Sequence, residues 1–246
     1  TAELYRLEVG YPIGYFWGYE MEGIIQNEKQ LQEYLDRNCS GDKANSLQGE
    51  SLQPGDVMFK DVNGNGKIDK GDEDKTMIGD PNPDFTMGLN INLSYKGFDF
   101  ALNGYGSFGQ QVAKSYRQFS DHPDDNYCTD VYTKYWTGEG STNQYPRFSD
   151  GKTANMSEIS RVWIEDADFF KISRISLGYD FKKLYKKLPV QKCRLYVSLS
   201  NYICFTGYSG MDPEVGFGNG TSWASGIDCG YYPSSRSFQV GMNINF

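Results

Sequence analysis

The chain has 246 residues, of which 38% are hydrophobic and 15% aromatic, and it contains 28 Gly and 19 Tyr. Its formal net charge of −8 repels phosphate backbones, which argues against nucleic acid as a partner. No run of 18 apolar residues occurs, so no transmembrane helix is predicted. Few apolar residues with many Tyr and Gly are instead typical of an all-β protein whose strands hide only one face.

The first predicted elements are a strand and a short helix. Apolar and aromatic residues alternate with mostly small ones over residues 9–19, with the period of two expected of a strand. The helix is predicted over residues 27–35, where Asn27 is a candidate N-cap and Leu31 and Leu35 stand four residues apart. We expect it in an external loop. Because the chain starts at Thr1 without a signal-peptide pattern, we expect a fragment or a processed chain.

Residues 55–80 form a predicted loop that carries a cation-binding pattern. Within residues 61–72, oxygen-bearing side chains occupy positions 1, 3, 5, 9 and 12, and Gly66 stands at position 6, where the chain must turn sharply. This is the spacing of an EF-hand loop, which also offers the backbone carbonyl of position 7. Asp72 replaces the usual, longer Glu at position 12. The predicted ligands of a structural Ca²⁺ are Asp61, Asn63, Asn65, Lys67 through its carbonyl, Asp69 and Asp72.

The alternative for this loop is a polar turn without a cation, because Asn-Gly pairs are common in hairpin turns. With Ca²⁺, the loop would be held rigid on the outside of the protein.

Further strands are predicted towards the C-terminus. The period-two pattern covers residues 85–95, 98–102, 175–181 and 237–246, and a shorter, less regular stretch covers 195–199. About ten residues at roughly 3.3 Å each, tilted by about 45°, span on the order of 25 Å, which matches the apolar band of an outer membrane. In the last strand the apolar residues are Phe238, Val240, Met242, Ile244 and Phe246.

The connections between these strands alternate between short and long. The turn at Lys96-Gly97 has two residues and residues 182–193 make a link of about a dozen, whereas about 60 residues precede residue 169 and about 30 precede residue 237. Outer-membrane barrels combine short periplasmic turns with long extracellular loops. If the last strand ends in the periplasm, every long connection falls outside. The link is also basic, since residues 182–194 hold six Lys or Arg and no acid.

Aromatic side chains in the long connections are candidates for stacking on sugars or for anchoring a protein partner. The candidates for substrate or partner contacts are Tyr116, Trp136, Tyr145, Trp163, Tyr208 and Trp223. The alternative is that such rings pack the connections together or form a membrane girdle. No catalytic residues are predicted, because His122 is the only histidine and lies in a polar stretch. The protein is therefore not expected to be an enzyme.

Motifs along the whole chain resemble the SusC/RagA family of TonB-dependent outer-membrane transporters. In order, the matching stretches are Gly10–Gly14, Gly18-Tyr19, Gly23–Gln26, Gly55–Val57, the 61–72 loop, Ile78–Pro81, Pro83–Phe85, Tyr135-Trp136, Arg147, Phe169–Ser173, Asn201-Tyr202, Phe205-Thr206, Tyr208–Gly210, Asp212–Glu214 and the strand 237–246. Because the stretches keep their order and cover essentially the whole chain, the resemblance is specific.

The resemblance implies antiparallel transmembrane β-barrel strands, here about six of a barrel of about 22, over residues 1–246 with no plug domain. It implies import of glycans or peptides across a bacterial outer membrane, powered by TonB through the missing N-terminal part. A SusD-like surface lipoprotein is the implied partner. The last strand, ending at Phe246, resembles the signal by which the barrel-assembly machinery recognises its clients.

A secreted or surface calcium-dependent β-sandwich that binds carbohydrate is the alternative class. It shares the strand alternation, the cation-type loop and the loop aromatics. It does not predict alternating short and long connections or a last strand ending in Phe.

Overall fold

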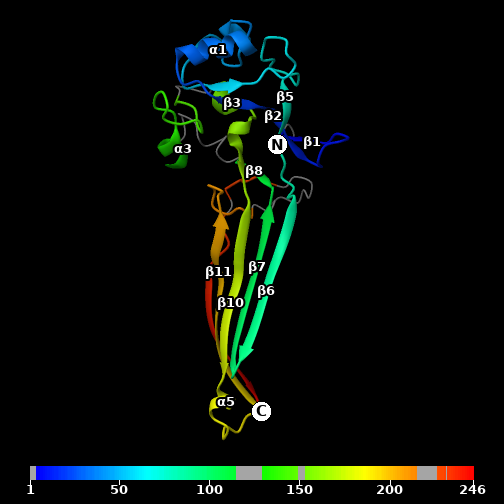
Figure 1. The fold of residues 1–246 in the computed structure, drawn as a ribbon, viewed down its shortest axis with the longest axis vertical. Coiled ribbons are helices and arrows are strands. Elements are labelled where there is room, and N and C mark those ends of the chain that lie inside the picture. Colours follow the sequence, from blue (N-terminus) through cyan, green and yellow to red (C-terminus); the bar gives the residue numbers. More distant parts are fainter. Residues whose placement is uncertain (1–3, 115–128, 149–152, 215–225, 231) are drawn as a thin grey trace. The chain divides into compact units, whose positions relative to one another are not determined.

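The computed structural model describes residues 4–114, 129–148, 153–214, 226–230 and 232–246 (Figure 1). The chain divides into two compact units. Unit 1 comprises residues 1–82, 111–165 and 215–230, and unit 2 comprises residues 83–110, 166–214 and 231–246. The sequence predicts barrel strands and loops over residues 1–246 without a domain boundary. In the structure, the N-terminal segment and the long connections build a unit with its own core.

Unit 1 combines short strands with short helices. The sheets have the orders β1-β2-β5, β3-β4 and β8-β9. The strands are β1 (Tyr5–Arg6), β2 (Tyr15–Tyr19), β3 (Met21–Ile24), β4 (Val57–Phe59), β5 (Lys75–Gly79), β8 (Gln111–Ala113) and β9 (Ile164–Asp166, which reaches the unit boundary). The helical elements are α1 (Glu28–Asn38), η1 (Lys43–Asn45), η2 (Gly49–Ser51), α3 (Thr129–Lys134), α4 (Ala154–Ser157) and η3 (Arg161–Trp163).

Helix α1 packs on the main core of unit 1. Asn27 caps it by accepting the Gln30 N–H at 2.9 Å, which confirms the predicted cap, and the helix runs three residues further than predicted, to Asn38. On its buried face, the Tyr34 hydroxyl donates to the Phe59 carbonyl at 2.9 Å. The core consists of Tyr19, Ile25, Leu31, Tyr34, Leu35, Cys39, Leu47, Leu52, Val57, Met58, Phe59 and Ile68. Among the described residues, no helix is both long and apolar enough to cross a bilayer.

The strand predicted over residues 9–19 is shorter and belongs to unit 1. Only Tyr15–Tyr19 is extended and paired, as β2, while Val9 and Ile13 are exposed. Gly10 and Gly14 take positive φ values of 99° and 69°, which a continuous strand does not accommodate. The expectation of about six barrel strands is therefore corrected to five.

Those five strands form one antiparallel sheet in unit 2, with the order β12-β11-β10-β7-β6 (Figure 1). Their bounds are β6 (Phe85–Tyr95), β7 (Phe98–Phe108), β10 (Phe169–Asp180), β11 (Lys192–Thr206) and β12 (Ser237–Asn245). The Lys96-Gly97 turn is confirmed, and both residues have positive φ, 46° and 98°, as in the tight hairpin turns that match strand twist. Phe181, predicted as strand, instead begins the short helix α5 (Phe181–Leu184).

The register of this sheet places apolar residues in rows that cross all five strands. One row is Leu93, Phe100, Leu177, Val197 and Val240, and the next is Tyr95, Phe98, Tyr179, Leu195 and Met242. Between them lies a row of Ser94, Asp99, Gly178, Tyr196 and Gly241. Because side chains alternate between faces along a strand, one face of the sheet is apolar and the other polar.

The apolar face is exposed, whereas charged residues keep to the other face. Leu93, Leu177 and Val240 are 60%, 51% and 60% exposed. By register, the charged residues of the five strands, which are Asp99, Lys171, Arg174, Asp180, Lys192 and Arg194, all belong to the polar face. A soluble sandwich buries the apolar face against a second sheet. The exposed apolar face is instead the arrangement of a membrane barrel wall.

Tight packing of the β2 glycine leads to the first prediction. A Cβ on Gly18 would lie 2.4 Å from the Ile159 carbonyl oxygen and 2.8 Å from Ile78 Cδ1. We expect Gly18→Ala in the full-length parent protein to destabilise unit 1 by about 1–3 kcal/mol, as overpacking does. The measurement is limited proteolysis of purified protein, and we expect the variant to be cleaved within residues 4–82 faster than wild type.

The matched control is Gly88→Ala, because a Cβ there meets nothing within 4 Å. Equal protease resistance of the two variants would contradict the packing of β2.

Candidate functional site

The predicted cation loop lies between β4 and β5 and is anchored to the core of unit 1. Ile68 is buried, and its N–H donates to the Asn45 carbonyl at 2.8 Å. Gly66 takes a φ of 80°, and a Cβ on it would lie 2.1 Å from Ser40 Oγ. The positive φ favours glycine here, which confirms the turn predicted at this position.

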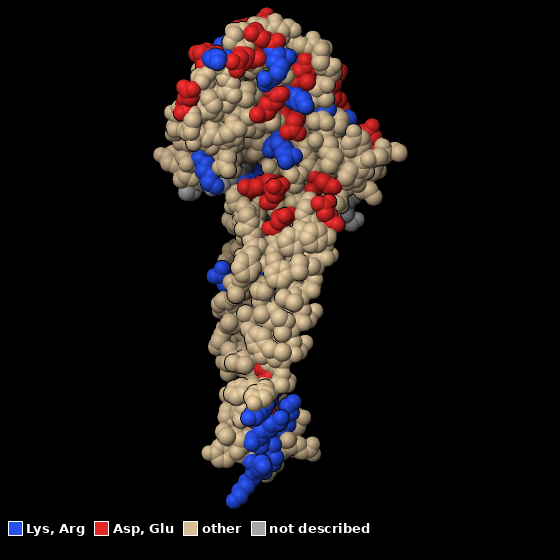
Figure 2. Space-filling model, in the orientation of Figure 1, with Lys and Arg blue, Asp and Glu red and all other residues tan. Residues whose placement is uncertain are grey.

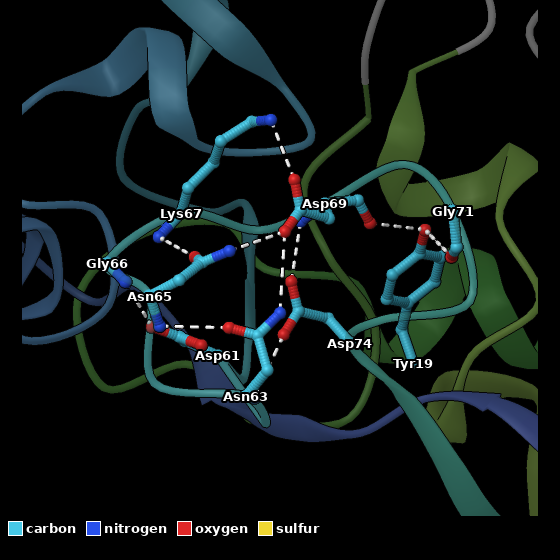
Figure 3. A network of polar contacts seen from close by, with 9 residues as sticks. All are labelled: Tyr19, Asp61, Asn63, Asn65, Gly66, Lys67, Asp69, Gly71 and Asp74. Atoms are coloured by element: carbon cyan, nitrogen blue, oxygen red, sulfur yellow. Dashed lines mark hydrogen bonds and ion pairs between the residues drawn. The ribbon is translucent and has the colours of Figure 1, made fainter.

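Inside the loop, side-chain oxygens accept backbone N–H groups (Figure 3). Asp61 accepts from Gly64 through Oδ1 at 2.6 Å and from Gly66 through Oδ2 at 2.7 Å. Asn63 Oδ1 accepts the Asn65 N–H at 2.9 Å, and Asn65 Oδ1 accepts the Lys67 N–H at 2.9 Å. These are the local side-chain-to-backbone bonds that stabilise tight Asn and Asp turns.

Asp69 is where several of the predicted ligands meet. Its Oδ2 accepts from the amides of Asn63 at 3.4 Å and Asn65 at 2.6 Å, while the Lys67 ammonium lies 2.7 Å from Oδ1. The hydrogen bond from Lys67, assisted by the Asn65 amide, lowers the pKa of the Asp69 carboxyl. The side chains of Asn63, Asn65 and Asp69 are thus brought together, with the Lys67 side chain supplying the positive charge. Asp61 instead accepts from the backbone of the same loop.

Asp72 is turned away from this group. Its carboxylate pairs with Arg6 and lies 3.4 Å from Lys75 Nζ. Desolvation opposes ionisation, but Arg6 and Lys75 outweigh it and hold the pKa of Asp72 below its usual value. Among the described residues, no three His, Cys, Asp or Glu side chains are close enough together to hold a metal ion.

Asp74, which the EF-hand pattern does not include, holds the loop by accepting three of its backbone N–H groups. It is fully buried and accepts the N–H groups of Val62 at 3.0 Å, Asn63 at 3.2 Å and Asp69 at 2.6 Å. The Tyr19 hydroxyl closes the far side by donating to the Asp69 carbonyl at 2.9 Å (Figure 3). The only sequence signal for Asp74 is an acidic residue two positions beyond the pattern.

A second buried cluster in unit 1 joins three of the motif stretches. Arg147 Nε lies 2.8 Å from Asp56 Oδ1, and the Asn155 amide donates to the same carboxylate at 2.8 Å. Burial raises the pKa of Asp56 although Arg147 and Asn155 act in the opposite direction. A Cβ on Gly55 would lie 2.6 Å from Trp136, so the ring packs directly on this glycine.

Most of the predicted loop aromatics that the structure describes are buried. Tyr145 and Trp163 lie in the interior of unit 1 and Tyr208 in that of unit 2, so these rings pack the connections rather than present a stacking surface. Trp136 is half-buried, and its indole N–H donates to Gln26 Oε1 at 3.1 Å. Tyr116 and Trp223 lie outside the described residues.

Unit 2 carries a charged cluster on the polar face of its sheet. The ammonium of the buried Lys171 pairs with Glu214 and lies 3.8 Å from Asp212 and 3.2 Å from Ser234 Oγ. Tyr105, beside Lys171 in the register, donates its hydroxyl to Glu214. The cluster fastens the segments after β11 and before β12 to the sheet, beside a cavity of about 560 Å³.

Lys171 reaches this face through a change of register. Between Ile172 and Arg174, the pairing of β10 shifts against both β7 and β11. The extra residue relative to β7 reverses the alternation, which places Lys171 in the row of Gly88, Tyr105 and Cys204. Simple alternation from Ile175 would have assigned Lys171 to the apolar face.

The residues of the last strand lie as predicted. Phe238, Val240, Met242, Ile244 and Phe246 are all exposed, and β12 pairs with β11 over Ser237–Asn245. Their exposed apolar face continues the rows of the neighbouring strands.

Comparisons with known proteins agree with this architecture. TonB-dependent receptor P3 of Formosa agariphila is 32% identical over 245 residues, which are 98% of this chain and 23% of that receptor. TonB-dependent receptor SusC of Bacteroides thetaiotaomicron is 32% identical over 204 residues, 80% of this chain and 18% of SusC. No family model matches the chain.

Solved structures share the fold at lower identity. The RagAB peptide transporter matches with a TM-score of 0.66 and 18% identity, covering 99% of this chain and 24% of that one. The RagAB peptide importer in its open-open state matches with a TM-score of 0.65 and 18% identity over 97% of this chain and 23% of that one. This chain thus spans about a quarter of the length of the proteins named here.

The identity to the two receptors, the RagAB-like fold and the exposed apolar face of the five-stranded sheet agree, and they show that the chain belongs to the SusC/RagA family of TonB-dependent outer-membrane receptors.

Proposed function

We propose that the parent protein imports glycans or peptides across the outer membrane, using TonB for energy and a SusD-like lipoprotein as its surface partner. This chain would contribute five strands to the barrel wall. The observation that carries the proposal is the register of unit 2, which gives every strand one apolar exposed face and one polar face. The named relatives support it, since all are TonB-dependent receptors or components of a peptide importer.

The same register suggests how the strands are oriented. The turn at Lys96-Gly97 and the link between β10 and β11 lie at one end of the sheet, and the long connections leave from the other (Figure 1). Because barrels of this class keep short turns in the periplasm, the end with α5 is assigned to the periplasm. The polar face with Lys171, Asp99 and Arg194 would then line the interior.

The last strand supports a further step in this proposal. The alternating exposed residues from Phe238 to Phe246 form a regular apolar surface on one face of the last strand. We propose that the barrel-assembly machinery recognises this surface in the parent protein.

Cargo and partner are tested in the organism that makes the parent protein. We expect affinity purification of the full-length protein from outer membranes to recover a SusD-like lipoprotein. Deletion of the parent gene should abolish growth on one cargo class, glycan or peptide, as sole carbon source, while growth on monosaccharides or amino acids remains. Wild-type growth on every glycan and peptide mixture supplied would contradict an importer.

Neighbouring residues of β12 test the assignment of the two faces. Val240 is apolar and 60% exposed, and Gln239 precedes it on the polar face. We expect Val240→Arg in the full-length protein to cost about 1–3 kcal/mol, because an arginine on the lipid-facing side, between the interface and the midplane, must leave water. The amount of folded, heat-modifiable protein in the outer membrane should fall several-fold.

Gln239→Arg is the matched control and should leave that amount nearly unchanged, since its side chain belongs to the polar face. Similar levels for the two variants would exclude a lipid-facing role for the apolar face.

We also propose that the 61–74 loop holds a structural Ca²⁺. The donor set supports the proposal, because Asp61, Asn63, Asn65 and Asp69 lie in one loop and carry the hard oxygens that Ca²⁺ prefers. A cation there would take over the charge that Lys67 supplies to Asp69. Asp72 would join only by leaving Arg6, so the ligand set proposed here is smaller than an EF-hand's.

Trypsin provides a direct readout, because Lys67 and Lys70 are exposed cleavage sites within the loop. In purified full-length protein, we expect Ca²⁺ to slow cleavage there several-fold relative to a chelator. Asp61→Asn should abolish the protection, because it removes a charged ligand. Asp72→Asn should retain it, because that carboxylate pairs with Arg6.

Equal cleavage of the wild-type loop with Ca²⁺ and with chelator would contradict the cation and leave the loop as a polar turn held by its own hydrogen bonds.

A further inference from the structure

The basic link between β10 and β11 is folded and charged on its surface. Asp180 caps α5 by accepting the Lys182 N–H at 3.1 Å. The Lys182 ammonium turns inward and donates to the carbonyls of Lys186 at 2.9 Å and Leu188 at 2.6 Å. These bonds fix the backbone of the link, so that Lys183, Lys186 and Lys187 project as exposed side chains.

The acidic side chains of this end are already engaged. Asp180 accepts from the backbone of Lys182 and from Cys193 at 3.2 Å. Asp99 pairs with Arg194, whose Nε lies 2.8 Å from its Oδ1. Residues 182–194 hold six Lys or Arg, and the exposed Lys96 of the neighbouring turn joins them, so the positive charge exceeds that of these two carboxylates. Figure 2 shows basic side chains gathered at this end of unit 2, next to strands that present few charges on the face drawn.

Exposed apolar residues are interleaved with these lysines. Leu184 is 60% exposed and Tyr185 is 65% exposed, directly between Lys183 and Lys186. In bulk water this much exposed apolar surface has no compensation. At a membrane interface, tyrosine rings sit at the level of the headgroups and lysines extend towards them.

The link also follows directly on the apolar rows. The row of Tyr95, Phe98, Tyr179, Leu195 and Met242 is the last complete apolar row before the turn and the link. Lys96 follows Tyr95 in the chain, and its ammonium lies 5.1 Å from the Tyr95 ring centroid. Beyond the apolar core of a bilayer comes a headgroup layer roughly 5–8 Å deep, which is where these lysines fall.

We propose that Lys96, Lys183, Lys186 and Lys187, with Leu184 and Tyr185 as apolar anchors, form a binding surface for anionic phospholipid headgroups of the periplasmic leaflet. The proposal rests on the membrane orientation given above. Phosphate-bearing headgroups of phosphatidylglycerol or cardiolipin match the charge, and the continuity with the apolar rows sets the depth. An acidic protein segment would match the charge but would not explain the exposed Leu184 and Tyr185.

The test measures lipid retention by the full-length protein. Protein in detergent micelles that also contain phosphatidylcholine and a minor share of cardiolipin is examined by native mass spectrometry. For Lys183→Gln, Lys186→Gln and Lys187→Gln combined, we expect cardiolipin retention to fall at least tenfold, since each lysine near an anionic surface contributes about a fivefold factor. Phosphatidylcholine retention should not change.

The control combines Lys29→Gln, Lys60→Gln and Lys70→Gln, which remove the same charge from exposed positions of unit 1. It should retain cardiolipin within about twofold of wild type. Retention by the triple link variant within that range, or an equal loss in the control, would overturn the proposal. If the triple variant does not fold, Lys186→Gln and Lys187→Gln are measured singly, and an unchanged retention in both has the same meaning.

The outcome for lipid is separable from the proposed function. Val240→Arg and Gln239→Arg report whether the sheet faces the membrane, whereas the lysine variants report only on the headgroup surface. If Val240→Arg and Gln239→Arg had equal effects, the membrane orientation itself would be overturned.

Discussion

The hydrogen-bonded register of β10 between β7 and β11 is the constraint on which the structure of unit 2 depends. It aligns residues of neighbouring strands, so that apolar rows and polar rows alternate across the whole sheet. A slip of one residue would move every side chain of a strand to the opposite face. The register shift at Ile172–Arg174 uses this property locally, because it brings Lys171 to the polar face, where Glu214 and Asp212 can pair with it. An unpaired lysine on the lipid-facing side would be far more costly.

Unit 1 depends on contacts that join distant segments of the chain. The buried Asp56–Arg147 pair, with Asn155, joins the start of the cation-type loop to the long connection after β8. Such a pair contributes little net stability, since the desolvation of both charges offsets their attraction. Its effect is better understood as specificity. With Gly55 against Trp136, it favours one way of bringing these stretches together, because any other arrangement leaves a buried charge without a partner.

The sequence predicts best what depends on local periodicity and turn chemistry. The alternation in 85–95 and 237–246, the Lys96-Gly97 turn and the Asn27 cap are all set by neighbouring residues, and the structure has them as predicted. Tertiary contacts decide the rest. Residues 9–14 alternate like a strand, yet glycine geometry ends the pattern before Tyr15. The role of Asp74 depends on the folded loop, which brings the N–H groups of Val62 and Asp69 to its carboxylate. The burial of Tyr145 and Trp163 could not be predicted from the sequence either, since composition does not say which ring a connection folds around.

The edges of the five-stranded sheet explain why the proposed transport would require the whole parent protein. Among the described residues, strands β6 and β12 each have a neighbour on one side only, which leaves a row of backbone donors and acceptors to be satisfied. In hydrocarbon, unsatisfied backbone groups cost several kcal/mol each, so only a closed barrel is stable there. The exposed apolar rows lead to the same conclusion, because a barrel wall covers its apolar side chains with lipid and not with a second sheet. The five strands are therefore complete in register but not in closure, and a closed barrel exists only when further strands pair with both edges.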